Sequence, residues 1–444
     1  MKMPEKPPGM RDILTQTTDQ EKIRRIMGLG YDLPIPHKYL HWDKLRHLKP
    51  PEGFSHDEWW AALKLRRQVQ AKLVPLRDSR GNPFVYSTVD PVGEILQKID
   101  QGAGGLIRMP DQVANPDTKD QYYVDSLIRE AITSSQLEGA ATTRTVAKEM
   151  IRTGRPPRDK SEQMILNNFF TMRRISALKD KPLSTELVFE IHRIITEKTL
   201  DQDSATGRVR LPNEQIVVGD MYGEVFHDPP LAEQLSERMD LMCNFANEKI
   251  PDAFVHPVLR SIILHFWLAY DHPFVDGNGR VARALFYWSM LRHGYWLFEF
   301  ISISQILLRA PAKYARAFLY TETDDNDLTY FILHQLDVIR RAIDGLHDYV
   351  ARKTAALQAA ERRLRGITVL NPRQQALVGH ALRHPQQRYT FRSHQMSHNV
   401  AYQTARTDLL DLENRGLLTG RKVGKTWHFT PAPDLEERLS RPAQ

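Results

Sequence analysis

The strongest constraint on this chain is a helical pattern of apolar residues between about residues 121 and 360. Apolar side chains recur there every three to four positions, as in Val124, Leu127, Ile128, Ala131 and Ile132. This spacing is typical of helices that bury one face. We expect further helices over the runs 163–178, 184–199, 231–248, 257–270, 279–293 and 328–349. The fold class is therefore predicted to be mainly α.

A short segment interrupts the helical pattern. Residues 214–218 and 224–226 have a strand-like composition and flank the turn-rich stretch 219–223. This arrangement predicts a β-hairpin within helical surroundings. We expect it to form an exposed flap.

The two ends of the chain differ from its centre. Several prolines break any long helix before Trp59 and Trp60, so 1–115 is predicted to be an irregular region followed by helices. Residues 351–368 have the composition of a helical connector. Three short helical runs and two strands with a turn then follow, which is the order of a small α+β winged-helix domain over 369–432. The helical domain between these ends is expected to cover 120–350.

Composition limits the class of protein. The chain has 444 residues, of which 41% are hydrophobic and 26% charged, as in globular proteins of two or three domains. Its single cysteine, Cys243, cannot form an internal disulfide, and no C-x-x-C pair is present to hold zinc. No segment resembles a signal peptide or a membrane span. We expect a cytoplasmic protein with no membrane partner.

Positive charge gathers near the C-terminus. The chain has a net charge of +7, and 371–430 contain nine Lys and Arg against Asp408, Asp411 and Glu413. Such an excess on a winged helix favours DNA as a partner. Winged helices also dock proteins, and that alternative stays open.

The loop 272–280 carries the residues suited to phosphate chemistry. Pro273, Gly277 and Gly279 stop the preceding helix, and a new helix can start at Asn278 or Gly279. Glycines at a helix N-terminus let a phosphate approach unpaired N–H groups.

Charged side chains complete this phosphate site. Arg280 and Arg283 lie one helical turn apart, where both are expected to reach a polyphosphate. Asp276 offers the carboxylate that magnesium prefers, and His272 offers a base. These parts suit phosphoryl or nucleotidyl transfer.

The complete string resembles the signature of Fic (filamentation induced by cyclic AMP) domains. It reads His272-Pro273-Phe274-Val275-Asp276-Gly277-Asn278-Gly279-Arg280, with Arg283 following. The resemblance extends over about 120–350. It implies transfer of AMP from ATP to a Ser, Thr or Tyr hydroxyl of a protein, with loss of pyrophosphate.

The resemblance also implies a role for each residue of the loop. His272 is the base, Asp276 holds Mg²⁺, the turn Gly277-Asn278-Gly279 cradles phosphate, and Arg280 and Arg283 hold the outer phosphates. One residue departs from the family pattern: Asp271 stands where an apolar residue usually precedes the histidine. Its effect on the pKa of His272 has no direction that the sequence can assign.

Two further segments resemble parts of the family. The segment Ile216, Val217, Val218 and Gly219 belongs to the flap that is expected to hold the target as an added strand. Ser134, Glu138 and Gly139 close the helix 122–139 and resemble the family's inhibitory motif. In that motif the glutamate pairs with the second arginine, here Arg283, and obstructs the γ-phosphate.

These observations lead to a protein adenylyltransferase that is autoinhibited by Glu138. Its partner would be a protein with a hydroxyl side chain, the chain itself included, and a homodimer is a further hypothesis. A de-AMPylase that uses the same residues stays open as an alternative. A DNA-binding regulator whose Fic domain senses nucleotide is the third hypothesis, against which the intact His272 argues.

Overall fold

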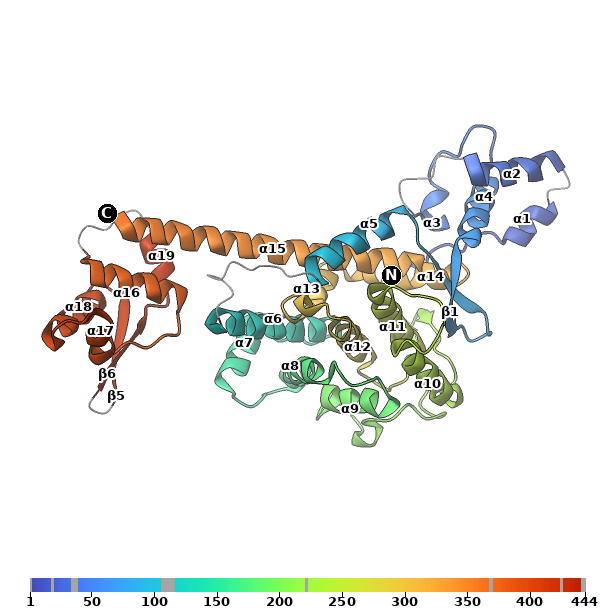
Figure 1. Cartoon of the computed structure of the whole chain (residues 1–444). Coiled ribbons are helices and arrows are strands. Elements are labelled where there is room, and N and C mark those ends of the chain that lie inside the picture. Colours follow the sequence, from blue (N-terminus) through green and yellow to red (C-terminus); the bar gives the residue numbers. More distant parts are fainter. Residues whose placement is uncertain are drawn as a thin grey trace. The chain divides into compact units, whose positions relative to one another are not determined.

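The computed structural model of the chain describes residues 2–16, 20–32, 39–104, 116–219, 223–366, 370–423 and 426–440. Helices dominate these residues, whose strands form three separate two-stranded sheets (Figure 1). The mainly α fold class is thus confirmed. The chain divides into two compact units, residues 1–105 with 127–342, and residues 106–126 with 343–444. No helix of the described residues is long and apolar enough to cross a membrane.

The centre of the first unit is a set of packed helices. They are α6 Pro116–Leu137, α7 Arg144–Thr153, α8 Lys160–Leu178, α9 Thr185–Thr196, α10 Leu235–Ala246, α11 Pro257–Asp271, α12 Asn278–Arg292, α13 Ile303–Leu308, α14 Pro311–Thr323 and the start of α15 Thr329–Gly366. Helices α11 and α12 are buried on nearly every side, and Trp267 and Trp288 have no exposed surface. A helix that is apolar all round belongs inside a protein, so these two form the core.

Several helices of the core begin with an ordinary side-chain cap, but α10, α12 and α14 do not. The hydroxyl of Ser184 accepts a hydrogen bond from the backbone N of Leu187 at 3.2 Å and starts α9. The Asp159 carboxylate does the same for α8. Helix α12 starts after Gly277, which makes no side-chain cap. The N-terminal N–H groups of α12 therefore have no partner in the side chain of the N-cap residue.

The N-terminal part of the first unit adds smaller helices and a hairpin. These elements are α1 Met10–Gln16, α2 Gln20–Asp32, α3 Trp42–Leu45, α4 His56–Val69, β1 Ala71–Arg77, β2 Pro83–Ser87, α5 Asp90–Ile99 and a π-helical turn at Asp100–Gly104. Strands β1 and β2 pair antiparallel, which the sequence did not lead us to expect. Buried Phe84 of β2 packs its ring on Phe266 and Tyr270 of α11, at 5.4 and 4.9 Å between centroids. The N-terminal region thus joins the central core.

A buried ion pair also ties this region to α14. The Lys64 ammonium of α4 lies 2.6 Å from the carboxylate of Asp324, the residue that ends α14. Both side chains are almost wholly buried. Removing either one would leave a buried charge without its partner, which is strongly destabilising.

The expected flap is present but shorter than predicted. Its strands are β3 Val218–Gly219 and β4 Val225–His227, paired antiparallel. The predicted first strand at 214–218 is mostly wrong, because only Val218 is in a strand. Glu214 instead accepts hydrogen bonds from Arg208 and from the backbone N of Leu211, which hold the preceding chain in a turn. Residues 220–222 lie outside the described part of the chain.

The second unit contains three helices and a hairpin in the expected order. They are α16 Pro372–Arg383, α17 Phe391–His398, α18 Tyr402–Asn414, β5 Leu418–Val423 and β6 Thr426–Pro431, followed by α19 Leu435–Ser440. A β-bridge between Tyr389 and Phe429 adds a third extended segment to this hairpin. Phe429 is fully buried, and Leu364 near the end of α15 joins the same core. We call residues 372–431 the C-terminal module.

Candidate active site

The loop 272–277 joins the two most buried helices of the chain. His272 ends α11 in the left-handed conformation, with a φ of 44°, and Gly277 has a φ of 89° before α12. Asn278 closes the loop, because its Oδ1 accepts from the backbone N of Phe274 at 2.9 Å. Its Nδ2 donates to the Phe274 carbonyl at 2.7 Å. The Asn278 side chain therefore shapes the loop through both its oxygen and its nitrogen.

His272 is held as a neutral imidazole, and its Nε2 has no hydrogen-bond partner among the described residues. Its Nδ1 lies 3.2 Å from the backbone carbonyl of Ala269, which can only accept. Nδ1 therefore carries the proton, and Nε2 has the lone pair. Burial lowers the pKa of His272 to about 4, so the ring is neutral near pH 7. A neutral imidazole with a free Nε2 can accept a proton from a hydroxyl.

Asp271, the unusual residue before His272, is bound elsewhere. Its Oδ1 accepts from Arg238 Nε at 2.8 Å, and its Oδ2 accepts from Trp267 Nε1 at 3.0 Å. The side chain is buried. Asp271 thus joins α10 to α11 and makes no hydrogen bond to His272.

Two residues outside the sequence motif hold the loop from the other side. The backbone N of Arg210 donates to the Pro273 carbonyl at 2.8 Å, and its Nε donates to the His272 carbonyl at 3.1 Å. His192 of α9 accepts from the backbone N of Gly207 through Nδ1, at 2.9 Å. Its Nε2 must then carry the proton and donates to the Asp276 carbonyl at 3.0 Å.

His192 is the functional residue that sequence reasoning missed. Its ring stacks on Phe274 with 3.9 Å between centroids. Burial lowers its pKa to about 4, which keeps the ring neutral and its Nδ1 able to accept. A histidine within an apolar helical run resembles an ordinary core residue, so the sequence held no signal for this role.

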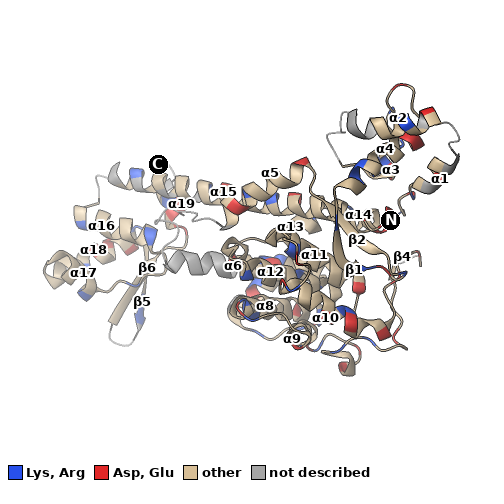
Figure 2. Ribbon diagram, turned by 45° about the vertical axis from the view of Figure 1, so that its right-hand side comes forward, with Lys and Arg blue, Asp and Glu red and all other residues tan. Residues whose placement is uncertain are grey.

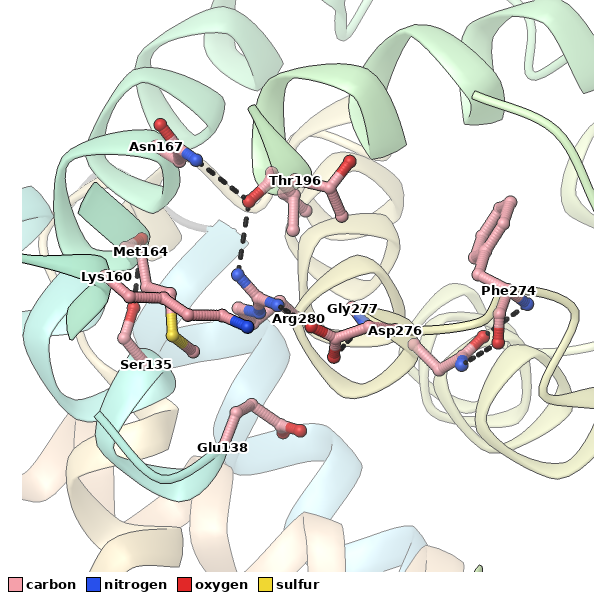
Figure 3. Close-up of polar contacts among 12 residues, drawn as sticks. Ser135, Glu138, Lys160, Met164, Asn167, Thr196, Phe274, Asp276, Gly277 and Arg280 are labelled. Atoms are coloured by element: carbon pink, nitrogen blue, oxygen red, sulfur yellow. Dashed lines mark hydrogen bonds and ion pairs between the residues drawn. The ribbon is translucent and has the colours of Figure 1, made fainter. Parts of the chain in front are cut away.

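Arg280 is fully buried and has other partners than Arg283. Its Nη1 donates to the Ile195 carbonyl at 3.1 Å, and its Nη2 pairs with Asp276 Oδ2 at 3.3 Å. Asn167 donates to the same carbonyl (Figure 3). The other oxygen of Asp276 accepts from the backbone N of Gly277 at 2.6 Å. Arg280 thus fixes Asp276 and the end of α9, whereas the sequence had placed it beside Arg283.

Arg283 meets the end of α6. Its Nε donates to the Ser134 hydroxyl and its Nη2 to the Ser134 carbonyl, both at 2.9 Å. Nη2 also lies 2.8 Å from Glu138 Oε1. Burial opposes the charge of Arg283, but the Glu138 carboxylate raises its pKa overall. Gly139 follows with a φ of 90°, a conformation that suits glycine.

Gly279 makes room for the Glu138 carboxylate. A Cβ at position 279 would lie 2.2 Å from Glu138 Oε1 and 3.1 Å from Arg283 Nη1. Only glycine allows this approach at the first turn of α12. The same absence of a side chain would admit a phosphate at that helix N-terminus.

These residues face a cavity of about 230 Å³ in the first unit. One part of its wall is polar and includes His272, Gly279, Arg283 and Glu138. The rest is largely apolar and is lined by Val218 and Phe226 of the flap, by Ala269 and Tyr270, and by Tyr314, Ala315, Phe318 and Leu319 of α14. The cavity thus has a polar part beside an apolar part.

A second charged pair lies in the wall, where the flap meets α14. His227 Nδ1 lies 2.7 Å from Glu322 Oε2, and its Nε2 lies 2.6 Å from the Tyr270 carbonyl. Burial alone would lower the pKa of His227, but the Glu322 carboxylate raises it overall. A doubly protonated ring satisfies both acceptors and holds the flap to the end of α11.

The structure brings together most of the residues that the sequence selected. His272, Gly279, Arg283 and Glu138 line the cavity, and of the expected flap residues only Val218 does so. Val217 is 55% exposed, and Ile216 precedes the strand. Asp276 and Gly277 lie in the adjoining loop, and Asn278 is the first residue of α12.

Similarity to known proteins is concentrated in the same region. The model of the Fic/DOC family matches residues 182–290. A protein adenylyltransferase Fic from Nematostella vectensis is 24% identical over 264 residues, which are 59% of this chain and 57% of that protein. Protein adenylyltransferase fic-1 from Caenorhabditis briggsae is 25% identical over 179 residues, covering 40% and 33% of the two chains. The chain spans about half the length of such relatives, or less.

A solved structure shares the fold. A Fic family protein from Desulfovibrio desulfuricans G20 superposes with a TM-score of 0.51 and 17% identity, covering 78% of this chain and 97% of that one. The helices around the loop, the sequence motif within it and the family match all indicate the same domain. Residues 182–290 are therefore a Fic domain.

Proposed function

We propose that this protein is an adenylyltransferase that moves AMP from ATP to a hydroxyl group of a protein. The observation that carries the proposal is that His272, Gly279 and Arg283 line one cavity whose remaining wall is largely apolar. Such a cavity suits a nucleotide, with its phosphates at the N-terminus of α12 and its base against α14. The adenylyltransferase names of the relatives support the same activity.

The reaction needs a base at the position of His272. The target oxygen attacks the α-phosphorus of ATP and forms a new O–P bond, while the bond from that phosphorus to the pyrophosphate oxygen breaks. The hydroxyl proton passes to His272 Nε2, and pyrophosphate leaves. The hydrogen bond from Nδ1 to Ala269 keeps Nε2 unprotonated and oriented.

The phosphates would lie on the first turn of α12. We assign the cradle to the backbone of Gly277, Asn278 and Gly279, and a direct charge contact to Arg283. Arg280 acts through Asp276, because its guanidinium is buried and bonded to that carboxylate.

Asp276 is the residue that would hold Mg²⁺. Its side chain is 46% exposed, and the described residues contain no group of three His, Cys, Asp or Glu that could hold a metal. One carboxylate together with ATP phosphates is a usual magnesium site, so these residues fit an ion that arrives with the nucleotide. Bound there, the ion would neutralise phosphate charge.

We propose that Glu138 restrains the reaction. Its carboxylate occupies the space beside Gly279 and pairs with the arginine assigned to phosphate binding. Ser134 supports the pair through its hydroxyl and its carbonyl. ATP can seat its outer phosphates fully only when this contact opens.

The target would be a protein that pairs with the flap beside Val218 and Gly219. The main-chain groups of a short two-stranded hairpin can add a third strand. We place the enzyme in the cytoplasm, since its single cysteine suits a reducing compartment.

Labelled nucleotides test the reaction. The full chain and its His272→Ala variant are incubated with ATP labelled at either the α- or the γ-phosphate. We expect protein labelling from the α-label alone, and only with His272. Labelling from γ would indicate a kinase. If neither label is transferred but AMP is released from a pre-adenylylated protein, removal is the main activity.

A further inference from the structure

The C-terminal module has a positive surface that the adenylyl transfer site does not use. Five basic side chains there are exposed and make no ion pair with any described residue: Arg388, Arg392, Arg406, Arg421 and Lys422. Arg421 and Lys422 lie on β5, where Figure 2 shows basic residues in blue. They face Trp427 and His428 across the hairpin, next to its turn.

The acidic residues of the same module are already bonded within it. Asp408 is buried and accepts from Asn371 at 2.8 Å, from Arg373 at 2.9 Å and from His394 at 3.1 Å. These contacts join α16, α17 and α18, so this carboxylate holds the scaffold together.

The other two acids are bonded as well. Asp411 accepts from Gln374 and from Arg415, each at 2.8 Å. Glu413 accepts from the backbone N of Gly420 at 3.0 Å. All three carboxylates of 371–430 therefore have internal partners, while five cations do not. A positive surface without matching carboxylates suits a polyanion.

Helix α18 has one buried apolar side and one exposed polar side. Ala405, Leu409 and Leu412 bury one side of it in the module core. Gln403 and Arg406 are exposed three positions apart on the other side. Gln and Arg are the residues that read adenine and guanine through paired hydrogen bonds in the major groove.

We propose that the C-terminal module binds duplex DNA, with α18 in the major groove and the β5–β6 hairpin on the backbone. In helix-turn-helix proteins the second helix lies in the major groove, and the first helix crosses the DNA backbone. Basic side chains on α17, on β5 and before α17 contact phosphates. DNA binding is independent of the proposed transferase chemistry, since His272 takes no part in it.

Salt dependence tests the phosphate contacts. The full chain is titrated onto a fluorescent duplex of about 30 base pairs of mixed sequence, at salt between about 50 and 200 mM. With four phosphate contacts we expect affinity to fall about 150-fold over this range. The double variant Arg421→Gln, Lys422→Gln should bind more weakly, and its affinity should fall only about 12-fold.

Matched variants separate DNA recognition from net charge. Arg415→Gln removes a charge from the same module, but one already paired with Asp411, and should retain the wild-type salt dependence. Gln403→Ala should reduce discrimination between duplex sequences without changing the salt slope. His272→Ala should bind DNA as the wild type does.

Two outcomes would overturn the proposal. One is no binding of the duplex at the lowest salt by a chain that keeps its native fold. The other is an equal loss of affinity in Arg415→Gln and in the hairpin double variant. In either case exposed Met396 and Tyr402 would favour a protein partner for this surface.

Discussion

Arginines are used in opposite ways in the two units of this chain. Arg280 and Arg283 on α12 are at most 1% exposed, and each is bonded to a carboxylate and to a backbone carbonyl. In the C-terminal module, Arg406 and Arg421 are exposed and have no ion-pair partner among the described residues. A buried, bonded guanidinium has one position and suits a small ligand of fixed shape. An exposed one can adjust to a long, repetitive anion.

The largest expected effect comes from His272→Ala. This variant tests whether the first unit carries the chemistry without the C-terminal module. Loss of a general base lowers a rate by about 10²- to 10⁴-fold. We expect adenylylation to fall by that factor while ATP affinity stays close to wild type, because phosphate contacts rest on α12. Calorimetry and labelling measure the two quantities. A parallel loss of ATP affinity would show that His272 is part of the binding site instead.

Glu138→Gly tests whether Arg283 is restrained by its partner. Hydrogen bonds to charged groups contribute roughly 1.5–3 kcal/mol, which corresponds to roughly 10- to 150-fold in rate. We expect adenylylation, including that of the protein itself, to rise by one to two orders of magnitude. Because the pair is largely buried, this ratio should change little with salt, whereas DNA affinity should fall steeply.

Three further variants test why adenylylation should rise in Glu138→Gly. Glu138→Ala controls for the flexibility that glycine adds at a helix end, about 1 kcal/mol relative to alanine. Glu138→Gln keeps the shape of the side chain and removes its charge. Arg283→Ala should abolish the gain of Glu138→Gly. If Glu138→Gly lowers AMP removal without raising transfer, the carboxylate is catalytic in the reverse sense.

His192→Phe tests how far the geometry of the loop 272–277 depends on the hydrogen bonds of His192. Phenylalanine keeps the stack on Phe274 but leaves the N–H of Gly207 and the carbonyl of Asp276 without their partner. Each unsatisfied buried group costs about 1–3 kcal/mol. We expect a lower urea midpoint and a kcat about tenfold lower, on the assumption that about 1.4 kcal/mol of this cost appears in the transition state.

His334→Phe serves as the matched control. It removes another buried histidine of the first unit, one that makes no hydrogen bond to the loop among the described residues. Its midpoint should shift while kcat stays near wild type. Equal kcat losses in the two variants would mean that His192 contributes only to stability.

A change of pH should affect the first unit through its buried histidines. Burial lowers the pKa to about 4 for His41, His192, His272 and His334, and to about 3 for His265. In the unfolded chain these rings titrate near about 6.5. Stability from the neutral rings is therefore present above about pH 6.5 and is lost as pH falls toward 4.

The expected slope is about 1.4 kcal/mol per pH unit for each such histidine within this window. His227 acts in the opposite direction, since its pKa is raised. Urea unfolding at about pH 7 and pH 5 measures the summed effect of these histidines on the free energy of unfolding. A midpoint that does not move, or that rises, between these values would contradict the burial of the neutral rings.

The sequence predicted the loop well because its features are local. Pro273, Gly277 and Gly279 determine where α11 stops and α12 starts. The different partners of Arg280 and Arg283 were not predictable, because they include the Ile195 carbonyl and Glu138, which lie far away in the sequence. The pairing of α6 with α12 was expected only through the family resemblance.

The N-terminal hairpin was missed for a definite reason. Pro75 lies within β1, and proline normally argues against a strand because it cannot donate to the ladder. The register shifts between Val74 and Arg77, so the strand accommodates the proline at an irregular point. The shortened flap has a similar cause, since the contacts of Glu214 with Arg208 depend on a folded turn.

The single cysteine gives this protein an internal kinetic reporter. Cys243 lies buried on α10, and burial raises the pKa of its thiol to about 12. Because the thiolate is the reactive form, an alkylating reagent can modify this residue only when α10 is exposed to solvent. The chain has no second thiol, so the rate of modification measures opening of the first unit alone, without any engineered label. Adding ATP should slow that reaction if the nucleotide binds the closed form, and DNA should leave it unchanged.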